Sequence, residues 1–308
     1  MKDIYYQYLN ILNIKEIPQF LIKYLESPSL LRLRNVGYFC GMDYASKNIY
    51  DFGEYISRFD HSLDVALITW KYTNNKEATL AGLFHDIATP CFSHVVDYMN
   101  KDYATQESTE ELTEEVIKRD EYLISCLKED NINVEDVIKF KKYTIVDNNR
   151  PKVCADRIDG VLLTGMFWTK DLSIEEVSEI LNHLIVFNNE ENELELGFND
   201  KSVANRVVEV SNNIDVYCHS NEDNYMMELL ANLTKYAIDN GYLKYEELFS
   251  FDEDKIHEIF NSINNEQFKS LYASFKCIKA DEVPFQEMPY IKKRDLRPLV
   301  DGKRPKYV

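Results

Sequence analysis

The chain has 308 residues and a formal net charge of −18. Its length allows one large domain or two modest ones with a sizeable core, while its charge disfavours non-specific binding to the phosphates of DNA or RNA. The polar N-terminus does not resemble a signal peptide, and no apolar run is long enough to span a bilayer, so we expect a cytoplasmic protein with no membrane partner.

Six cysteines are scattered along the chain without any close pair. This spacing indicates neither a zinc knuckle nor a disulfide framework. Cys91 has no pattern around it that would activate a thiol, so we expect it to be a packed side chain rather than a nucleophile.

Helical periodicity prevails along the chain, with few glycines and prolines. Apolar residues follow His61 at helical spacing over residues 63–69. The acidic stretch 107–130 is interpreted as a solvated helix face with a thin apolar stripe. Ser173 and Glu176 form a capping box that predicts a helix start, and residues 202–240 predict one long helix or a broken pair that stops at Gly241.

Two segments interrupt this helical pattern. The polar, acidic residues 188–200 are expected to form a loop or a subdomain boundary. Near the C-terminus, residues 291–300 lead into Asp301-Gly302, a hairpin-type dipeptide, and a basic tail follows. This end could form a short β-ribbon; we favour a surface tail that neutralises its own neighbours over an element that docks a second subunit.

His85 and Asp86 end a run, residues 78–84, that is apolar on nearly every side and is therefore typical of a core helix. Burying an imidazole and a carboxylate is costly unless a partner compensates them, and a bound cation is such a partner. His61 and Asp156 also lie at the ends of core-facing segments. Two imidazoles with two carboxylates suit a divalent ion such as Mn, Fe, Ni, Zn or Mg.

A single His, then His-Asp, then a distant Asp is the ordered pattern of the HD phosphohydrolase superfamily, which this chain resembles. The resemblance is nearest to the deoxynucleoside triphosphate triphosphohydrolase branch, and it is carried by the flanking residues as well. It runs from about Gln19 to Leu163 through these segments: Ser27 to Arg34, Arg58-Phe59-Asp60-His61-Ser62-Leu63, His85-Asp86-Ile87, Phe92-Ser93-His94 and Ala155-Asp156-Arg157-Ile158-Asp159.

The resemblance implies roles for eight side chains. His61, His85, Asp86 and Asp156 would bind the metal, which activates a water for attack on a phosphoester. Arg58 and Arg157 would contact phosphate, and His94, oriented by Asp97, would transfer a proton.

Simpler interpretations of two of these groups stay open. Arg58 could instead pair with Asp60 or Glu54, and His94 with Asp97 could be a helix-stabilising pair. His183, His219 and His257 have no ligand-like context, and we interpret them as core residues.

The chain departs from that branch around the substrate. The turn after Asp86 has no histidine, Gln106 stands where a second family histidine is expected, and Gly160 stands where a substrate-contacting tyrosine is expected. The loop before Arg58 also fails to match the sugar-reading loop. A deoxynucleoside triphosphate is therefore a doubtful substrate.

These observations together predict an all-α protein: an HD-domain helical bundle with a helical C-terminal extension, whose end could form a short terminal β-ribbon. We expect an N-terminal helical segment over 1–50, the HD core over 51–170 and a helical region over 171–308. The expected function is metal-dependent hydrolysis of a small phosphoester, a nucleotide by preference. The alternative is a catalytically weakened domain that senses a nucleotide and keeps a structural metal. The resemblance also implies a homo-oligomer.

Overall fold

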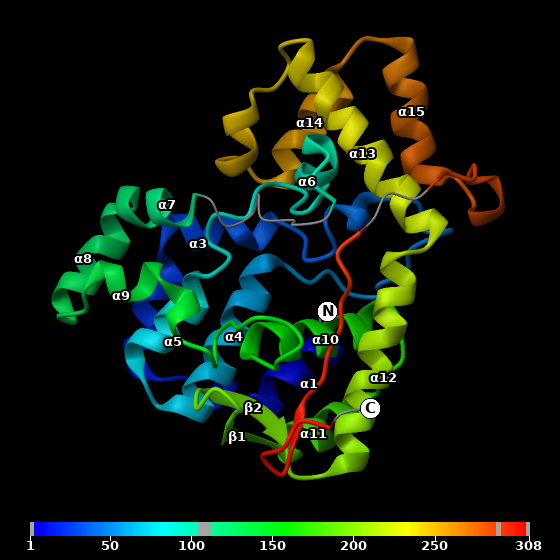
Figure 1. The fold of residues 1–308 in the computed structure, drawn as a ribbon. Helices are drawn as coiled ribbons and strands as arrows, with labels where there is room; N and C mark the ends of the chain where they lie inside the picture. The colour runs from blue at the N-terminus through cyan, green and yellow to red at the C-terminus, as the bar shows by residue number, and fades with distance from the viewer. Residues whose placement is uncertain (1–2, 104–111, 288–290, 306–308) are drawn as a thin grey trace.

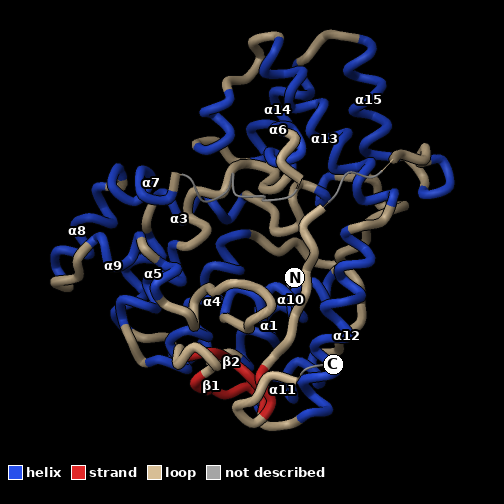
Figure 2. The backbone as a smooth tube through the Cα atoms, in the orientation of Figure 1, coloured by secondary structure: helices blue, strands red, loops and turns tan. Residues whose placement is uncertain are grey.

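The computed structural model describes residues 3–103, 112–287 and 291–305, and over these ranges the chain is predominantly α-helical (Figure 2). The described helices are α1 (Asp3–Ile11), α2 (Gln19–Ile22), α3 (Pro28–Arg32), α4 (Arg58–Thr73), α5 (Lys76–Phe84), α6 (Val95–Asn100), α7 (Thr113–Arg119), α8 (Glu121–Glu129), α9 (Val134–Ile138), α10 (Ala155–Phe167), α11 (Ile174–His183), α12 (Lys201–Cys218), α13 (Asn221–Asp239), α14 (Glu253–Ser262) and α15 (Glu266–Cys277). The predicted all-α class is confirmed. Among these helices, none is both long and apolar enough to cross a membrane.

Local capping signals place the helix starts. Ser57 and Asp60 form a capping box at the start of α4, and Ser173 and Glu176 form the predicted one at the start of α11. The predicted helix over 202–240 is a broken pair: α12 ends before His219, and Ser220 caps α13 by accepting from the backbone N–H of Asp223. The two long helices can therefore diverge at this point.

The centre of the molecule is formed by α4, which packs against α5 and α10, while α10 also packs against α12. Figure 1 shows α13, α14 and α15 grouped with α6 at the upper end, and α7, α8 and α9 at one side. The packing of α6 against α13 ties the segment after His85-Asp86 to the C-terminal region. One hydrophobic cluster extends through both parts, including Phe84, Phe167 and Phe260.

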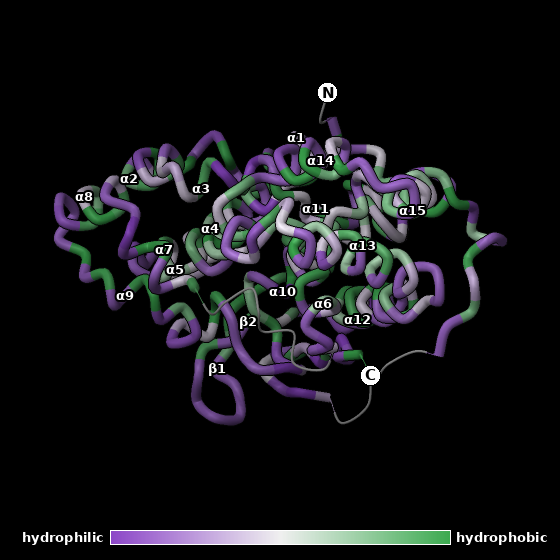
Figure 3. The backbone as a smooth tube through the Cα atoms, turned by 90° about the horizontal axis from the view of Figure 1, so that it is seen from above, coloured by the Kyte–Doolittle hydropathy of each residue, from purple (hydrophilic) through white to green (hydrophobic). Residues whose placement is uncertain are grey.

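The expectation of a loop over residues 188–200 is wrong for six of its thirteen residues, Asn188 and Leu194–Phe198, which lie in strands. β1 (Leu184–Asn188) pairs antiparallel with β2 (Leu194–Phe198), and the polar residues form the turn between them, which projects from the body in Figure 3. Periodicity missed β2 because Glu195, a strand residue, is fully buried. The Glu195 carboxylate is compensated by Arg304 at 2.7 Å.

The preferred interpretation of residues 291–300 as a surface tail is also wrong. This segment, here called the C-terminal strap, descends along one face of the molecule from the upper end to the sheet (Figure 1). It buries Ile291, Leu296 and Leu299. Its last residues form β3 (Leu299–Val300), which runs parallel to β2. This pairing needs glycine at position 197, because a Cβ there would lie 2.7 Å from the Leu299 carbonyl oxygen.

Asp301 and Gly302 both have positive φ, at 47° and 74°, and Val300 pairs with Lys303 across them, as the hairpin-type dipeptide predicted. Arg304 of the basic tail pairs with Glu190 and Glu195. The tail therefore neutralises its own neighbours, as expected, although the strap before it is part of the core.

The turn before α6 has an unusual backbone. Phe92 and Ser93 have φ of 63° and 47°, a conformation that costs free energy for residues with a Cβ. Glu253, the first residue of α14, accepts from the Phe92 N–H at 3.0 Å, and the Phe92 ring is fully buried. An element more than 150 residues away in sequence thus stabilises this turn.

Glu253 lies beside a second buried carboxyl group, that of Asp43. Among the described residues, Asp43 Oδ2 and Glu253 Oε2 have no hydrogen-bond partner, and both would crowd a Cβ at Gly37. Burial, followed by the charge of Asp43, raises the pKa of Glu253 to about 8, and burial raises the pKa of Asp43 to about 7. The folded chain therefore favours the protonated forms.

We expect Glu253→Gln to be more stable than the wild type at pH 8.5, by about 1–3 kcal/mol. Because folding raises the pKa of Glu253, the favourable contribution of its protonated form is complete below the unfolded pKa and is lost as the pH rises through about 8. Glutamine keeps the acceptor for Phe92 and cannot ionise. Urea unfolding at pH 5.5 and 8.5 measures this, with exposed Glu266→Gln, also at a helix start, as the matched control. A variant less stable than the wild type at pH 8.5 contradicts the prediction.

Candidate functional site

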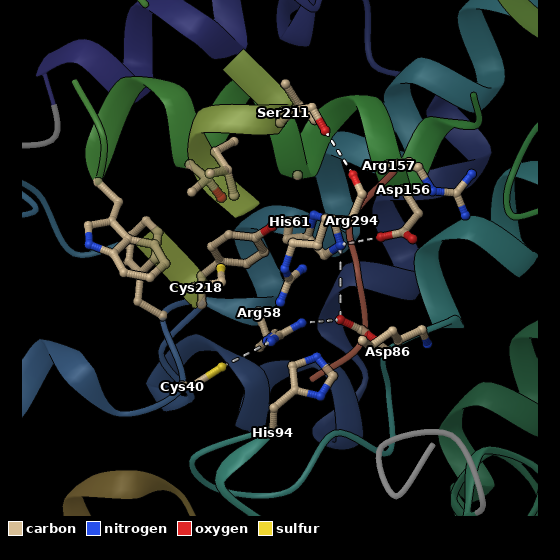
Figure 4. A pocket seen from close by; sticks show the side chains of 18 of the residues that line it. Cys40, Arg58, His61, Asp86, His94, Asp156, Arg157, Ser211, Cys218 and Arg294 are labelled. Atoms are coloured by element: carbon tan, nitrogen blue, oxygen red, sulfur yellow. Dashed lines mark hydrogen bonds and ion pairs between the residues drawn. The ribbon is translucent and has the colours of Figure 1, made fainter. Parts of the chain in front are cut away.

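Four predicted side chains converge at the ends of three helices. His61 lies in the first turns of α4, His85 and Asp86 follow the last residue of α5, and Asp156 lies in the first turn of α10. His61 Nε2 lies 3.1 Å from Asp156 Oδ1 and 4.0 Å from Asp86 Oδ2. His85 Nε2 lies 3.8 Å from Asp86 Oδ1 and 3.7 Å from Asp156 Oδ1. The structure therefore brings these four groups together, as Figure 4 shows for three of them.

Both imidazoles are oriented by groups on the side away from this cluster. His61 Nδ1 lies 2.7 Å from Asp159 Oδ2, and because a carboxylate only accepts, Nδ1 carries the proton. His85 Nδ1 likewise donates to the carbonyl oxygen of Gly82 at 2.7 Å. Asp159 is fully buried and also accepts from the hydroxyl of Tyr8 in α1. The Nε2 atoms are therefore left to face the two carboxylates.

The cluster has strongly shifted ionisation. Burial would raise the pKa of Asp86, but the charges of His85, Arg58 and His61 lower it to about 2. Burial would lower the pKa of His85, but Asp86 and Asp156 raise it to about 10. These opposite shifts reflect mutual stabilisation of charges in a buried place.

The donor set fits a divalent cation. His85 Nε2 is buried and, among the described residues, has no hydrogen-bond partner. Such an orphaned nitrogen is costly unless a ligand compensates it. Ligand atoms of His61, His85 and Asp86 lie within 4.8 Å of one another, and Asp156 lies against both imidazoles. Two nitrogen and two carboxylate donors suit a borderline or hard ion.

Arg58, the first residue of α4, pairs with neither Asp60 nor Glu54, the structural partners considered from sequence. Its Nη1 donates to Asp86 Oδ2 at 2.8 Å, and its Nε donates to Ser93 Oγ at 3.1 Å. Arg58 therefore connects the Asp86 carboxylate to the turn that precedes His94.

His94 immediately precedes α6, and its Nδ1 lies 2.8 Å from Asp97 Oδ2. Asp97 is fully buried, while the His94 side chain remains one quarter exposed. The carboxylate therefore fixes the proton on Nδ1 and leaves Nε2 available. His94 lines the same cavity as the four clustered residues.

Arg157 also lines this cavity, but its guanidinium is largely engaged by the loop before α10. It donates to Asn148 Oδ1 at 2.6 Å and to the Asn148 carbonyl oxygen at 2.7 Å, and it lies 3.4 Å from Asp147 Oδ1. Asp147 and Cys154 form a second potential ligand group with Asp156. Arg157 thus stabilises the loop that approaches Asp156.

The cavity has a volume of about 450 Å³, which is within the range of small-molecule sites. Residues from distant segments of the chain line it. Sequence reasoning missed several of its residues: Tyr38, Phe52, Arg150, Trp168, Asp223 and Arg294. All six lie outside the motif segments that carry the resemblance. The basic strap sequence was the one available signal for Arg294.

The space above Gly160 is filled by another residue. A Cβ at position 160 would lie 3.1 Å from the Tyr38 hydroxyl oxygen. The Tyr38 ring lies 5.0 Å from the His61 ring and 5.1 Å from the Arg58 guanidinium. A tyrosine from the N-terminal segment thus occupies this side of the cavity, where the resemblance predicted a tyrosine on α10. Gln106 lies outside the described residues.

Comparison with known proteins agrees with this geometry. Residues 58–159 match the HD domain family, and these bounds run from Arg58 at the start of α4 to Asp159 in α10. The chain is also 28% identical over 220 residues to the uncharacterized protein YdhJ of Bacillus subtilis (strain 168). That match covers 71% of this chain and 65% of the relative, slightly less than two thirds of its length. Residues 58–159 of this chain therefore form an HD domain.

Proposed function

We propose that this chain hydrolyses a phosphoester bond of a small phosphorylated molecule, with a nucleotide as the preferred class. The observation that carries the proposal is the convergence of His61, His85, Asp86 and Asp156 on one wall of a nucleotide-sized cavity. A divalent cation held there would acidify water and polarise a phosphoryl oxygen.

Two further features of the cavity support a nucleotide. Arg58, Arg157 and other cations line it in a chain whose net charge is −18, and they favour an anionic substrate locally. Another part of its lining is aromatic: Phe39 and Phe52 stack with ring centroids 4.1 Å apart, and Trp168 lies at 6.3 Å from Phe52. Flat aromatic surfaces beside a cationic wall suit a base and its phosphates.

The chain's own residues divide the remaining work. Arg58 is held between Asp86 and Ser93, so its guanidinium can contact a phosphate oxygen without leaving its ion pair. His94, oriented through Nδ1 by Asp97, would move a proton at Nε2 to the leaving oxygen or from the attacking water.

We expect phosphate or pyrophosphate release from a nucleotide panel when the purified chain is supplied with Mn, Fe, Ni, Zn or Mg. Asp86→Asn should abolish both release and metal retention, because it removes a charged ligand. Asp301→Asn is the matched control, since the hairpin turn accepts asparagine. Elemental analysis and product assays measure both quantities. Tight nucleotide binding without turnover, whichever of these metals is supplied, would instead favour the alternative of a catalytically weakened domain that senses a nucleotide.

We expect Asp159→Asn to weaken metal affinity by about 10- to 100-fold, because an amide can donate to His61 Nδ1 and so turn the imidazole's proton toward the cluster. Tyr8→Phe is the control, because it removes only the hydroxyl donor to Asp159. Titration of the stripped proteins with Mn measures this. Equal affinity in Asp159→Asn and the wild type contradicts the positioning role.

We expect His94→Gln to lower kcat by about 10²- to 10⁴-fold with metal content unchanged. Asp97→Asn should cause a smaller loss and move the pH–rate profile, since it acts only through His94. His183→Gln is the control, because His183 is bonded to Asn199 away from the cavity. Full activity of His94→Gln would show that the pair only stabilises the helix start.

A further inference from the structure

Arg294 lies in the C-terminal strap, and helix α12 binds both its backbone N–H and its carbonyl oxygen. The Arg294 N–H donates to Asp215 Oδ1 at 2.8 Å, and its carbonyl oxygen accepts from the Ser211 hydroxyl at 3.2 Å. Both partners lie on α12, and burial of Ile291 and Leu296 anchors the strap on either side. The backbone at Arg294 is therefore fixed, and its side chain enters the cavity (Figure 4).

The Arg294 guanidinium differs from the other arginines of the site. Arg58 has Asp86 at 2.8 Å, and Arg157 has the Asn148 side chain and several other acceptors. Within residues 3–103, 112–287 and 291–305, no carboxylate lies within ion-pair distance of the Arg294 guanidinium, and no hydrogen-bond acceptor meets it. Asp223, the nearby carboxyl group, accepts instead from the Tyr50 hydroxyl at 2.7 Å.

Arg294 and Arg58 act on the same part of the cavity. Both side chains line this cavity. Burial raises the pKa of Tyr38 and of Cys40, and the charges of Arg58 and Arg294 both oppose that shift. Two cations that line one cavity, of which only Arg58 has a carboxylate partner among the described residues, repel one another and favour a bound anion. A planar guanidinium fork is suited to bidentate contact with phosphate.

We propose that Arg294 binds a second phosphate group of the substrate, distinct from the one at His61, His85, Asp86 and Asp156. The C-terminal strap would thereby complete the substrate site. This inference rests on the proposed function. It narrows the substrate class to molecules with at least two adjacent phosphate groups, one at the His61–Asp86 cluster and one at Arg294.

The test measures binding of pyrophosphate to the full chain, which requires no turnover. We expect Arg294→Gln to weaken pyrophosphate binding by about 10- to 100-fold, with metal content unchanged. Arg294→Lys keeps the charge but loses the fork, and its affinity should lie between the two. Arg297→Gln is the matched control on the same strap, because that side chain is exposed and pairs with Asp295. Isothermal titration measures all four proteins.

Equal affinity for pyrophosphate in Arg294→Gln and the wild type overturns the inference. If Arg294→Gln does not fold, hydrogen exchange of the wild type decides: pyrophosphate should slow exchange over residues 291–300, and an unchanged rate overturns the inference. Failure of the proposed function is distinguishable, because a chain that hydrolyses nothing can still bind pyrophosphate through Arg294.

Discussion

The structure depends on compensating several ionisable groups that are buried together at the ends of three helices. Burying any one of these side chains alone in a hydrophobic interior would cost free energy. They are His61, His85, Asp86 and Asp156. They are tolerated because opposite charges face one another, because Arg58 adds a cation beside Asp86, and because Asp159 and the Gly82 carbonyl occupy the outer nitrogens of the imidazoles. Among the described residues, the Nε2 atom of His85 has no hydrogen-bond partner, and it faces the carboxylates of Asp86 and Asp156.

Elements from the C-terminal half, which lie outside the HD domain match, position parts of the site. Glu253 on α14 supports the Phe92-Ser93 turn, whose backbone conformation places Ser93 against Arg58 and His94 beside the cavity. α12 holds the strap that delivers Arg294. Because these contacts join segments distant in sequence, the site forms only when the whole fold has assembled.

The substrate side of the cavity is built differently from the metal side. The candidate metal side consists of the residues that the family pattern predicts, whereas Tyr38 fills the space above Gly160 and Arg294 adds a cation from the strap. The Arg294 guanidinium, which has no carboxylate partner among the described residues, is the feature from which we infer an anion-binding role.

The sequence by itself determined the helical class, the helix start at Ser173, and the grouping of the four candidate ligand residues, because capping, periodicity and an ordered motif are local signals. It did not predict β2, whose buried Glu195 breaks the expected alternation, or the path of residues 291–300, whose basic residues are typical of a surface. Only the tertiary structure decided that Tyr38, Asp223 and Arg294 share one cavity, because contacts between distant segments depend on how helices pack and leave no trace in local spacing.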